Sequence, residues 1–254
     1  MVSNGSAQEA VRIYAAGSLR AAMTEIAAAF EKQEGISVVT EFGASGLLRE
    51  RIEKGAPAEV FASADMAHPE TLHKAGRSGP IILFARNQLC ALASPKVKVA
   101  TGTLLDVLLD PKVRVGSSTP KNDPSGDYTW TMFEKSEKLR TGAYATLSGK
   151  ALKLVGGADA PPPPKDRSIY TVLMQENKAD VFLTYCTNAI LAAREAPGLQ
   201  VIQLPESLAV GAEYGMTVIN GASTAATRLY QFILSPPAQE ILIKHGFAAA
   251  GRSP

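Results

Sequence analysis

Strand-like and helix-like segments alternate over the first 65 residues, with very short connections. Residues 11–16, 36–44 and 58–65 have the apolar character of strands. Between them, residues 19–35 and 45–55 repeat apolar side chains at helical spacing, and a glycine ends each segment. Strands that are joined through helices in this way lie parallel, so the pattern predicts an α/β fold with a helix-covered parallel sheet.

A long apolar run at residues 80–95 interrupts the alternation, and a second α/β set follows it. We expect further helices at 104–110, 125–139 and 167–178, further strands at 113–118, 179–187, 199–205 and 214–219, and closing helices over 225–247 broken at Pro236-Pro237. Pro161 to Pro164 are too stiff for a helix or sheet and predict a surface loop.

This order of segments predicts two lobes joined by two crossings, near residues 83–94 and 200–219. Lobe 1 would comprise residues 1–85 and 206–254, and lobe 2 residues 86–205. A chain of 254 residues with 46% hydrophobic content is long enough to build both.

Charge and hydropathy exclude several classes of protein. A net charge of +2 is too small for a nucleic-acid binder, and the charges of residues 47–55 fit the solvated side of a helix. No apolar run reaches the ~18–20 residues that span a bilayer. Residues 1–10 show no signal peptide and resemble the polar start left when one is removed, although a cytosolic protein could begin in the same way.

Cys90 and Cys186 are the only cysteines, and each lies in an apolar segment. We expect them to be buried free thiols, since cysteine commonly packs as a small hydrophobic residue. A disulfide stays open, because the sequence cannot tell whether their Cα atoms lie within ~7 Å.

No catalytic or metal-binding pattern stands out. The string at Gly43–Gly46 lacks the G-x-S-x-G spacing of a serine hydrolase, and no nucleotide-binding glycine motif is present. His68 and His73 are five residues apart, so they do not form an i, i+4 zinc pair, and His245 completes no recognisable triad. We therefore predict no catalytic residues and no protein-bound metal.

Hydroxyl residues recur where the predicted helices begin. Helix starts expose backbone N–H groups and the positive end of the dipole, and in parallel sheets they lie where ligands bind. Several starts that converge would form an anion site from neutral donors. A serine is also an ordinary helix cap, and a strand-end tyrosine is often a core residue. The candidates are Ser18, Ser45, Ser125, Ser168 (or Asp166) and the strand-end Tyr185.

The segments 14–32, 42–65, 116–130 and 179–189 together resemble the molybdate-binding proteins of ABC importers. The resemblance extends over about residues 11–250. It implies the two-lobed periplasmic binding protein type II fold, in which each lobe is a mainly parallel sheet flanked by helices. It also implies that the two crossover strands act as a hinge and that the ligand sits in a cleft between the lobes.

In that family, hydroxyls and backbone N–H groups alone hold the oxyanion. Carried onto this sequence, the resemblance implies four ligand residues, namely Ser18, Ser45, Ser125 through its N–H, and Tyr185. The fifth position falls on Arg167, with Ser168 as the alternative. An arginine departs from the neutral family site, since it could neutralise an anion directly, or it could point to solvent.

We therefore expect an extracytoplasmic, periplasmic receptor that binds molybdate or tungstate and hands it to a membrane permease. It would be a monomer without cofactor, without catalysis and without nucleic-acid contact. Three alternatives stay open. The chain could bind sulfate, phosphate or a small organic acid with Arg167 as the counter-charge, it could be an enzyme on the same scaffold, or it could be a ligand-sensing module.

Overall fold

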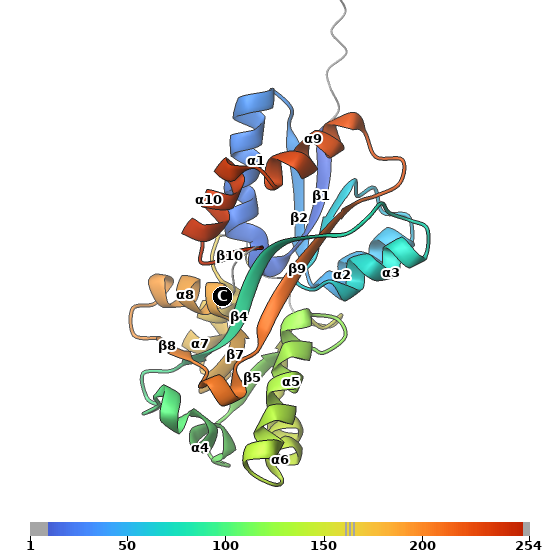
Figure 1. Ribbon diagram of the computed structural model, residues 1–254. Helices are drawn as coiled ribbons and strands as arrows, with labels where there is room; N and C mark the ends of the chain where they lie inside the picture. The colour runs from blue at the N-terminus through green and yellow to red at the C-terminus, as the bar shows by residue number, and fades with distance from the viewer. Residues whose placement is uncertain (1–9, 161, 163, 165, 251–254) are drawn as a thin grey trace, which may run out of the picture. The chain divides into compact units, whose positions relative to one another are not determined.

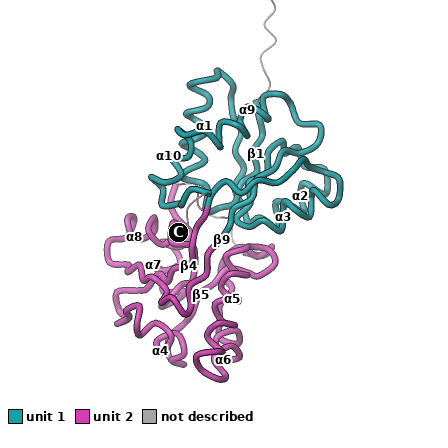
Figure 2. The backbone as a smooth tube through the Cα atoms, in the orientation of Figure 1, with its two compact units in different colours: residues 1–85, 213–253 teal, residues 86–212, 254 magenta. Residues whose placement is uncertain are grey.

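The computed structural model describes residues 10–160, 162, 164 and 166–250 (Figure 1). The chain divides into two compact units, which Figure 2 shows in different colours. The first runs to Ala85 and resumes at Glu213, and the second is the continuous segment Arg86–Ala212. The chain changes unit once within β4 (Ile82–Ala93) and once within β9 (Gly211–Val218). The predicted second boundary, between residues 205 and 206, lies upstream of this one.

The first unit contains strands in the order β2-β1-β3-β9. β1 (Val11–Ala16) pairs in parallel with β2 (Val38–Gly43) and with β3 (Val60–Ala62), and β9 pairs antiparallel with β3. The other elements are η1 (Gly17–Leu19), α1 (Arg20–Glu34), α2 (Ser45–Glu53), α3 (Ala67–Lys74), α9 (Thr224–Ile233), α10 (Pro236–Lys244) and β10 (Ala248–Ala249).

The second unit contains strands in the order β4-β7-β5-β6. β5 (Val115–Ser118) pairs in parallel with β6 (Leu152–Val155) and β7 (Val181–Tyr185), while β4 pairs antiparallel with β7 and β8 (Gln200–Gln203). The helices are η2 (Thr101–Thr103), α4 (Leu104–Leu109), α5 (Pro124–Leu139), α6 (Ala143–Lys150), α7 (Ile169–Gln175), α8 (Cys186–Glu195) and η3 (Glu206–Leu208).

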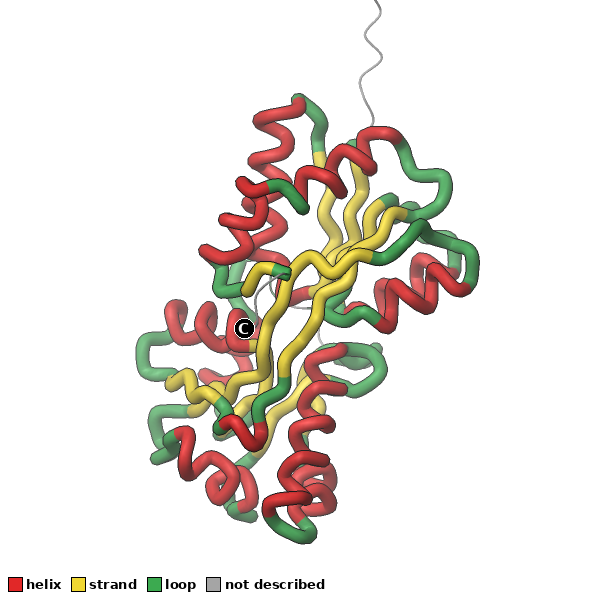
Figure 3. The backbone as a smooth tube through the Cα atoms, viewed as in Figure 1, coloured by secondary structure: helices red, strands yellow, loops and turns green. Residues whose placement is uncertain are grey.

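The local sequence explains these elements. α1 buries Met23, Ile26 and Phe30 on one face, and Gly35 ends it in the left-handed conformation at φ 69°. β7 is buried on both faces, with Val181 and Leu183 in one apolar cluster and Phe182 in another. Helices cover the strands of each unit (red and yellow in Figure 3). The predicted α/β class with largely parallel strands is confirmed.

Other predictions meet the structure less closely. The sequence did not predict α3, α6 or β6, and the helix expected at 167–178 is only Ile169–Gln175. Of the predicted proline loop, Pro162 and Pro164 lie outside any helix or strand. Pro161 and Pro163 fall outside the described residues, and so do residues 1–9, on which the expectation of a removed signal peptide rested.

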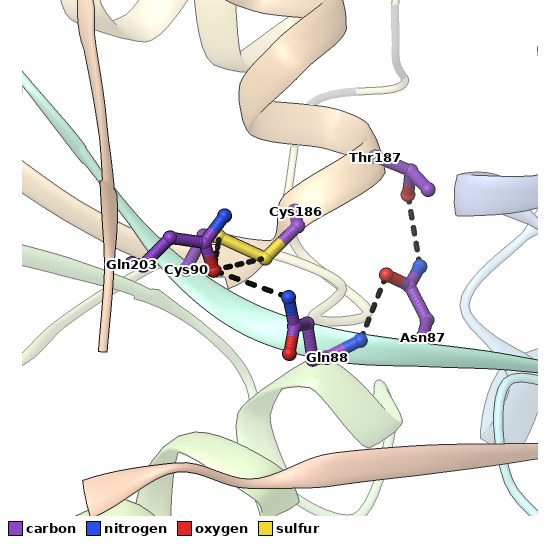
Figure 4. The surroundings of a disulfide bond; sticks show 6 residues. All are labelled: Asn87, Gln88, Cys90, Cys186, Thr187 and Gln203. Atoms are coloured by element: carbon purple, nitrogen blue, oxygen red, sulfur yellow. Dashed lines mark hydrogen bonds between the residues drawn. A yellow bond between two sulfur atoms is a disulfide. The ribbon is translucent and has the colours of Figure 1, made fainter. Parts of the chain in front are cut away.

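The expectation of two free thiols is wrong. Cys90 on β4 and Cys186 at the start of α8 form a disulfide with a Cα–Cα distance of 4.8 Å (Figure 4). The two residues are 96 positions apart in sequence, and the antiparallel pairing of β4 with β7 brings them together. Both are almost completely buried, as predicted, but as a covalent link.

Candidate functional site

The ends of three parallel strands lie side by side in the first unit. Ala16 at the end of β1 pairs with Gly43 at the end of β2, and Ala15 pairs with Ala62 of β3. Ser18 lies two residues after the end of β1, and Ser45 lies two residues after the end of β2. The residues before these helices, Ala16 and Ala44, have side chains that cannot cap, so neither supplies a hydrogen-bond acceptor to the first N–H groups of the helix. Hydroxyl and backbone donors therefore gather at one edge of this unit.

Each of the two serines makes one internal hydrogen bond. The Ser45 hydroxyl, 1% exposed, accepts the N–H of Ala64 at 3.1 Å, which leaves its own proton available to donate. The Ser18 hydroxyl lies 2.9 Å from the phenol of the buried Tyr214. At Gly17, an added β-carbon would meet only the Gly43 carbonyl at 3.9 Å, so an alanine would also fit there.

Ser63, just after β3, is hydrogen-bonded to a carboxylate. Its hydroxyl donates to Asp65 at 2.8 Å, and Asp65 also accepts the His68 N–H at 3.1 Å. The partner of this hydroxyl is thus a carboxylate and not the imidazole of a Ser-His pair.

The start of α5 in the second unit differs from these open helix starts. Asp123 caps the helix, with its Oδ1 accepting the Ser125 N–H at 3.0 Å, and its carbonyl accepts the Gly126 N–H at 2.8 Å. The backbone N–H through which Ser125 was expected to act is therefore already bonded. Close packing fixes this arrangement, because an added β-carbon on Gly126 would lie 2.6 Å from the Pro120 nitrogen.

The hydroxyl of Ser125 remains available instead. It is buried and has no hydrogen-bond partner among the described residues, and the same holds for the hydroxyl of Ser117 on β5. A buried polar group without a partner costs roughly 1–3 kcal/mol, so such groups call for an explanation. One explanation is that these hydroxyls donate hydrogen bonds to a ligand when it is bound.

Tyr185 lies close to the same helix. It ends β7, precedes α8 and is 2% exposed, and its ring packs edge-to-face against Tyr128 at 6.1 Å. Tyr128 stands on α5 within one turn of Ser125. Through Tyr128, Tyr185 thus packs against the part of α5 that carries Ser125. The first N–H groups of α8 have no side-chain cap.

Tyr170 is a neighbour that the sequence did not single out. Burial raises the pKa of its phenol far above the ordinary value, and the charge of Asp123 raises it further, while hydrogen bonds with Thr184 and Asn188 lower it in part. The phenol is therefore a neutral donor near the ends of β5 and β7. A tyrosine in an apolar helical pattern carries no sequence signal for this role.

Arg167 and Ser168 lie elsewhere in this unit. Arg167 precedes α7 and is exposed, and its guanidinium donates to Gln175 at the other end of that helix. Ser168 caps α7, and its N–H donates to both carboxylate oxygens of Glu195, at 3.0 and 2.9 Å. Glu195 ends α8, so the length of that helix, about 15 Å, separates it from Tyr185.

Across residues 10–160, 162, 164 and 166–250, no group of three or more His, Cys, Asp or Glu side chains could hold a metal ion. None of the helices in the same part of the chain is long and apolar enough to cross a membrane.

Comparison with known proteins now identifies the family. Residues 11–248 match the family described as bacterial extracellular solute-binding protein. The uncharacterized protein PM1146 of Pasteurella multocida is 36% identical over 225 residues, which cover 88% of this chain and 92% of that one. The molybdate-binding protein ModA of Escherichia coli is 29% identical over 248 residues, covering 93% and 88%.

Two solved structures share the fold. The periplasmic molybdate-binding protein of Azotobacter vinelandii aligns with a TM-score of 0.75 at 22% identity, covering 94% of this chain and 98% of that one. The sulfate-binding protein SubI of Mycobacterium tuberculosis aligns with a TM-score of 0.78 at 20% identity, covering 96% and 88%. With the family match over nearly its whole length, the chain belongs to the bacterial extracellular solute-binding proteins, which are receptors and not enzymes.

Proposed function

We propose that this receptor binds molybdate, and tungstate as well, and delivers it to the membrane permease of an ABC importer as a periplasmic monomer. The observation that carries the proposal is a donor set without formal positive charge. Ser18 and Ser45 supply hydroxyls at the strand ends of the first unit, and Ser125 and Tyr185 supply hydroxyls in the second. The E. coli relative named for molybdate supports this choice of ligand.

Neutral donors are sufficient for such a ligand. A hydrogen bond to a charged group contributes about 1.5–3 kcal/mol, so four of them contribute roughly 6–12 kcal/mol. The loss of translational and rotational freedom on association costs at least ~4 kcal/mol. Micromolar or tighter binding is therefore compatible with these hydroxyls and the uncapped backbone N–H groups beside them.

Arg167 and Ser168 stay predictions from the sequence. The bonds of Arg167 to Gln175 and of Ser168 to Glu195 weigh against a place for either in this donor set. A small organic acid that relies on Arg167 as counter-charge is disfavoured for the same reason.

Sulfate is the second candidate, and the structural likeness to a sulfate-binding protein favours it. Both ligands are tetrahedral dianions with similar acceptors, so the donor types alone do not distinguish them. The size of the binding cavity would.

Isothermal titration calorimetry with sodium molybdate, tungstate and sulfate tests the proposal. We expect saturable 1:1 heat with molybdate and tungstate, and none with sulfate at the same concentration. Binding heat with sulfate alone would make sulfate the ligand. The absence of heat with all three oxyanions would exclude molybdate, tungstate and sulfate as ligands.

A further inference from the structure

The junction at which β7 ends and α8 begins is bonded to one short stretch of β4. Tyr185 pairs with Leu89 in the antiparallel ladder, and the next residue along the chain forms the disulfide Cys90–Cys186. Ladder and disulfide thus hold consecutive residues of the junction against consecutive residues of β4.

A third bond completes the attachment. The Asn87 side-chain amide donates to the Thr187 hydroxyl at 2.9 Å in a buried position (Figure 4). Three consecutive residues of the junction, 185–187, are therefore each tied to the segment 87–90. Only the middle bond is covalent, and only that one can be broken without changing the sequence.

This junction carries donors of the proposed site. Tyr185 supplies the phenol, and the first turn of α8 supplies N–H groups that have no side-chain cap. Their direction is set by the backbone at Tyr185 and Cys186, which are neighbours in the chain. Donors that are fixed before binding give higher affinity than donors that must be ordered by the ligand.

On the basis of the function proposed above, we propose that the Cys90–Cys186 disulfide is a positioning element for ligand binding. It holds Tyr185 and the start of α8 in the binding geometry, so that affinity for the oxyanion depends on the redox state of this pair. The disulfide also fits the setting of the family, since disulfides persist outside the cytoplasm.

The surroundings also accommodate the reduced pair. The Gln203 side-chain oxygen lies 3.4 Å from Cys90 Sγ and 3.8 Å from Cys186 Sγ, and it accepts a hydrogen bond from Gln88 at 3.1 Å. Dithiothreitol would supply two electrons and two protons, cleave the S–S bond into two thiols and itself become a cyclic disulfide. Each new S–H would find the Gln203 oxygen as an acceptor nearby. Reduction should therefore loosen the junction and leave the fold in place.

A thermodynamic cycle tests the proposal. The molybdate Kd is measured by calorimetry for the oxidised protein, the dithiothreitol-reduced protein and the variant Cys90→Ala/Cys186→Ala, each with Tyr185 and with Tyr185→Phe. We expect loss of the disulfide to weaken binding about fivefold or more when Tyr185 is present, and by a clearly smaller factor in Tyr185→Phe, because both changes remove the interaction of the phenol and only that of the α8 N–H groups is left to lose.

Matched controls separate positioning from general stability. In Ser45→Ala, which lies in the other unit, the full fivefold loss should persist. Cys90→Ser/Cys186→Ser serves as a second variant, and thermal melts confine the titrations to temperatures at which every form is folded.

The outcomes are distinguishable. An unchanged Kd after loss of the disulfide, or an equal loss in Tyr185→Phe, overturns the positioning role while the receptor function stands. An oxidised wild type that binds no molybdate overturns the proposed function, and this inference with it.

Discussion

Two buried serines on α5 differ in what their hydroxyls bind. Ser136 donates to the carbonyl of Phe133 at 2.6 Å, whereas the Ser125 hydroxyl has no partner among the described residues. We expect Ser125→Ala to raise the molybdate Kd about tenfold or more, which corresponds to one lost hydrogen bond to a charged ligand. The same change should raise the unfolding free energy of the ligand-free protein by about 1 kcal/mol or more, because it removes a buried hydroxyl without a partner. Ser136→Ala should lower the unfolding free energy by about 1 kcal/mol and leave the Kd unchanged.

Calorimetry and urea unfolding of both variants check this pair. A Ser125→Ala protein that binds molybdate like the wild type would exclude this hydroxyl from the site. In that case the buried, unpartnered hydroxyl of Ser125 in the wild type would destabilise the fold without contributing to binding.

Asp123 places a negative charge beside two donors of the same unit, the Ser125 N–H and the Tyr170 phenol. An approaching dianion is repelled by this carboxylate. Asn is also a good N-cap, so Asp123→Asn keeps the start of α5 and removes the charge. We expect it to bind molybdate about two- to tenfold more tightly at low salt, and the gain should shrink as salt screens the repulsion.

The matched control is Glu134→Gln, an exposed residue farther along α5 that changes the net charge by the same amount. Equal effects of the two variants would mean that Asp123 acts only through the total charge of the protein.

Among the elements, the start of α9 is hydrogen-bonded to the sheet of the first unit through the carboxylate of Glu59. Glu59, next to β3, accepts hydrogen bonds from the Ser223 hydroxyl at 2.6 Å, the Ser223 N–H at 3.0 Å and the Arg12 N–H at 2.9 Å. Ser223 is also the N-cap of α9. Burial alone would raise the pKa of Glu59, but these hydrogen bonds outweigh it and lower the pKa below the ordinary value.

A lowered carboxyl pKa stabilises the folded state above the unfolded-state pKa of about 4.3 and loses this contribution as the pH falls through the folded value. Glu59→Gln should therefore lower the unfolding free energy by about 1 kcal/mol at pH 7, and the difference from wild type should shrink as the pH falls below the unfolded-state pKa and disappear below the folded-state pKa. Urea unfolding between pH 3 and 7 measures this. The exposed Glu240→Gln on α10 is the control, and a difference for Glu59→Gln that stayed constant with pH would contradict the assignment.

Some helices and strands can be predicted from the sequence, and others cannot. The strands and helices with clear periodicity, such as α1 and β7, were predicted nearly in full, because burial of one face or of both faces leaves a pattern in the residue order. α3 was missed, since it is short and has Pro69 in its first turn, a position that helices tolerate but that reads locally as a break.

At the scale of the whole molecule, the sequence predicts where the candidate donors lie but not which of them are already engaged. Asp123 precedes Ser125 by two positions, and only the structure shows that its carboxylate accepts a hydrogen bond from the Ser125 N–H. Glu195 and Cys90 act over 27 and 96 positions respectively, and such separations leave no local pattern. The disulfide therefore could not be predicted from the sequence, and neither could the direction of the Arg167 side chain.

The two units also differ in which parts of the chain form them. The second is one continuous segment, Arg86–Ala212, whereas the first needs β9 and the helices after it, from Glu213 onwards, to complete the sheet that β1, β2 and β3 begin. During synthesis the second unit can therefore assemble while β3 still lacks its neighbour, and the first must wait for the last part of the chain. Stalled or truncated translation products would consequently expose an unpaired strand of the first unit, the kind of edge that quality-control chaperones and proteases act upon.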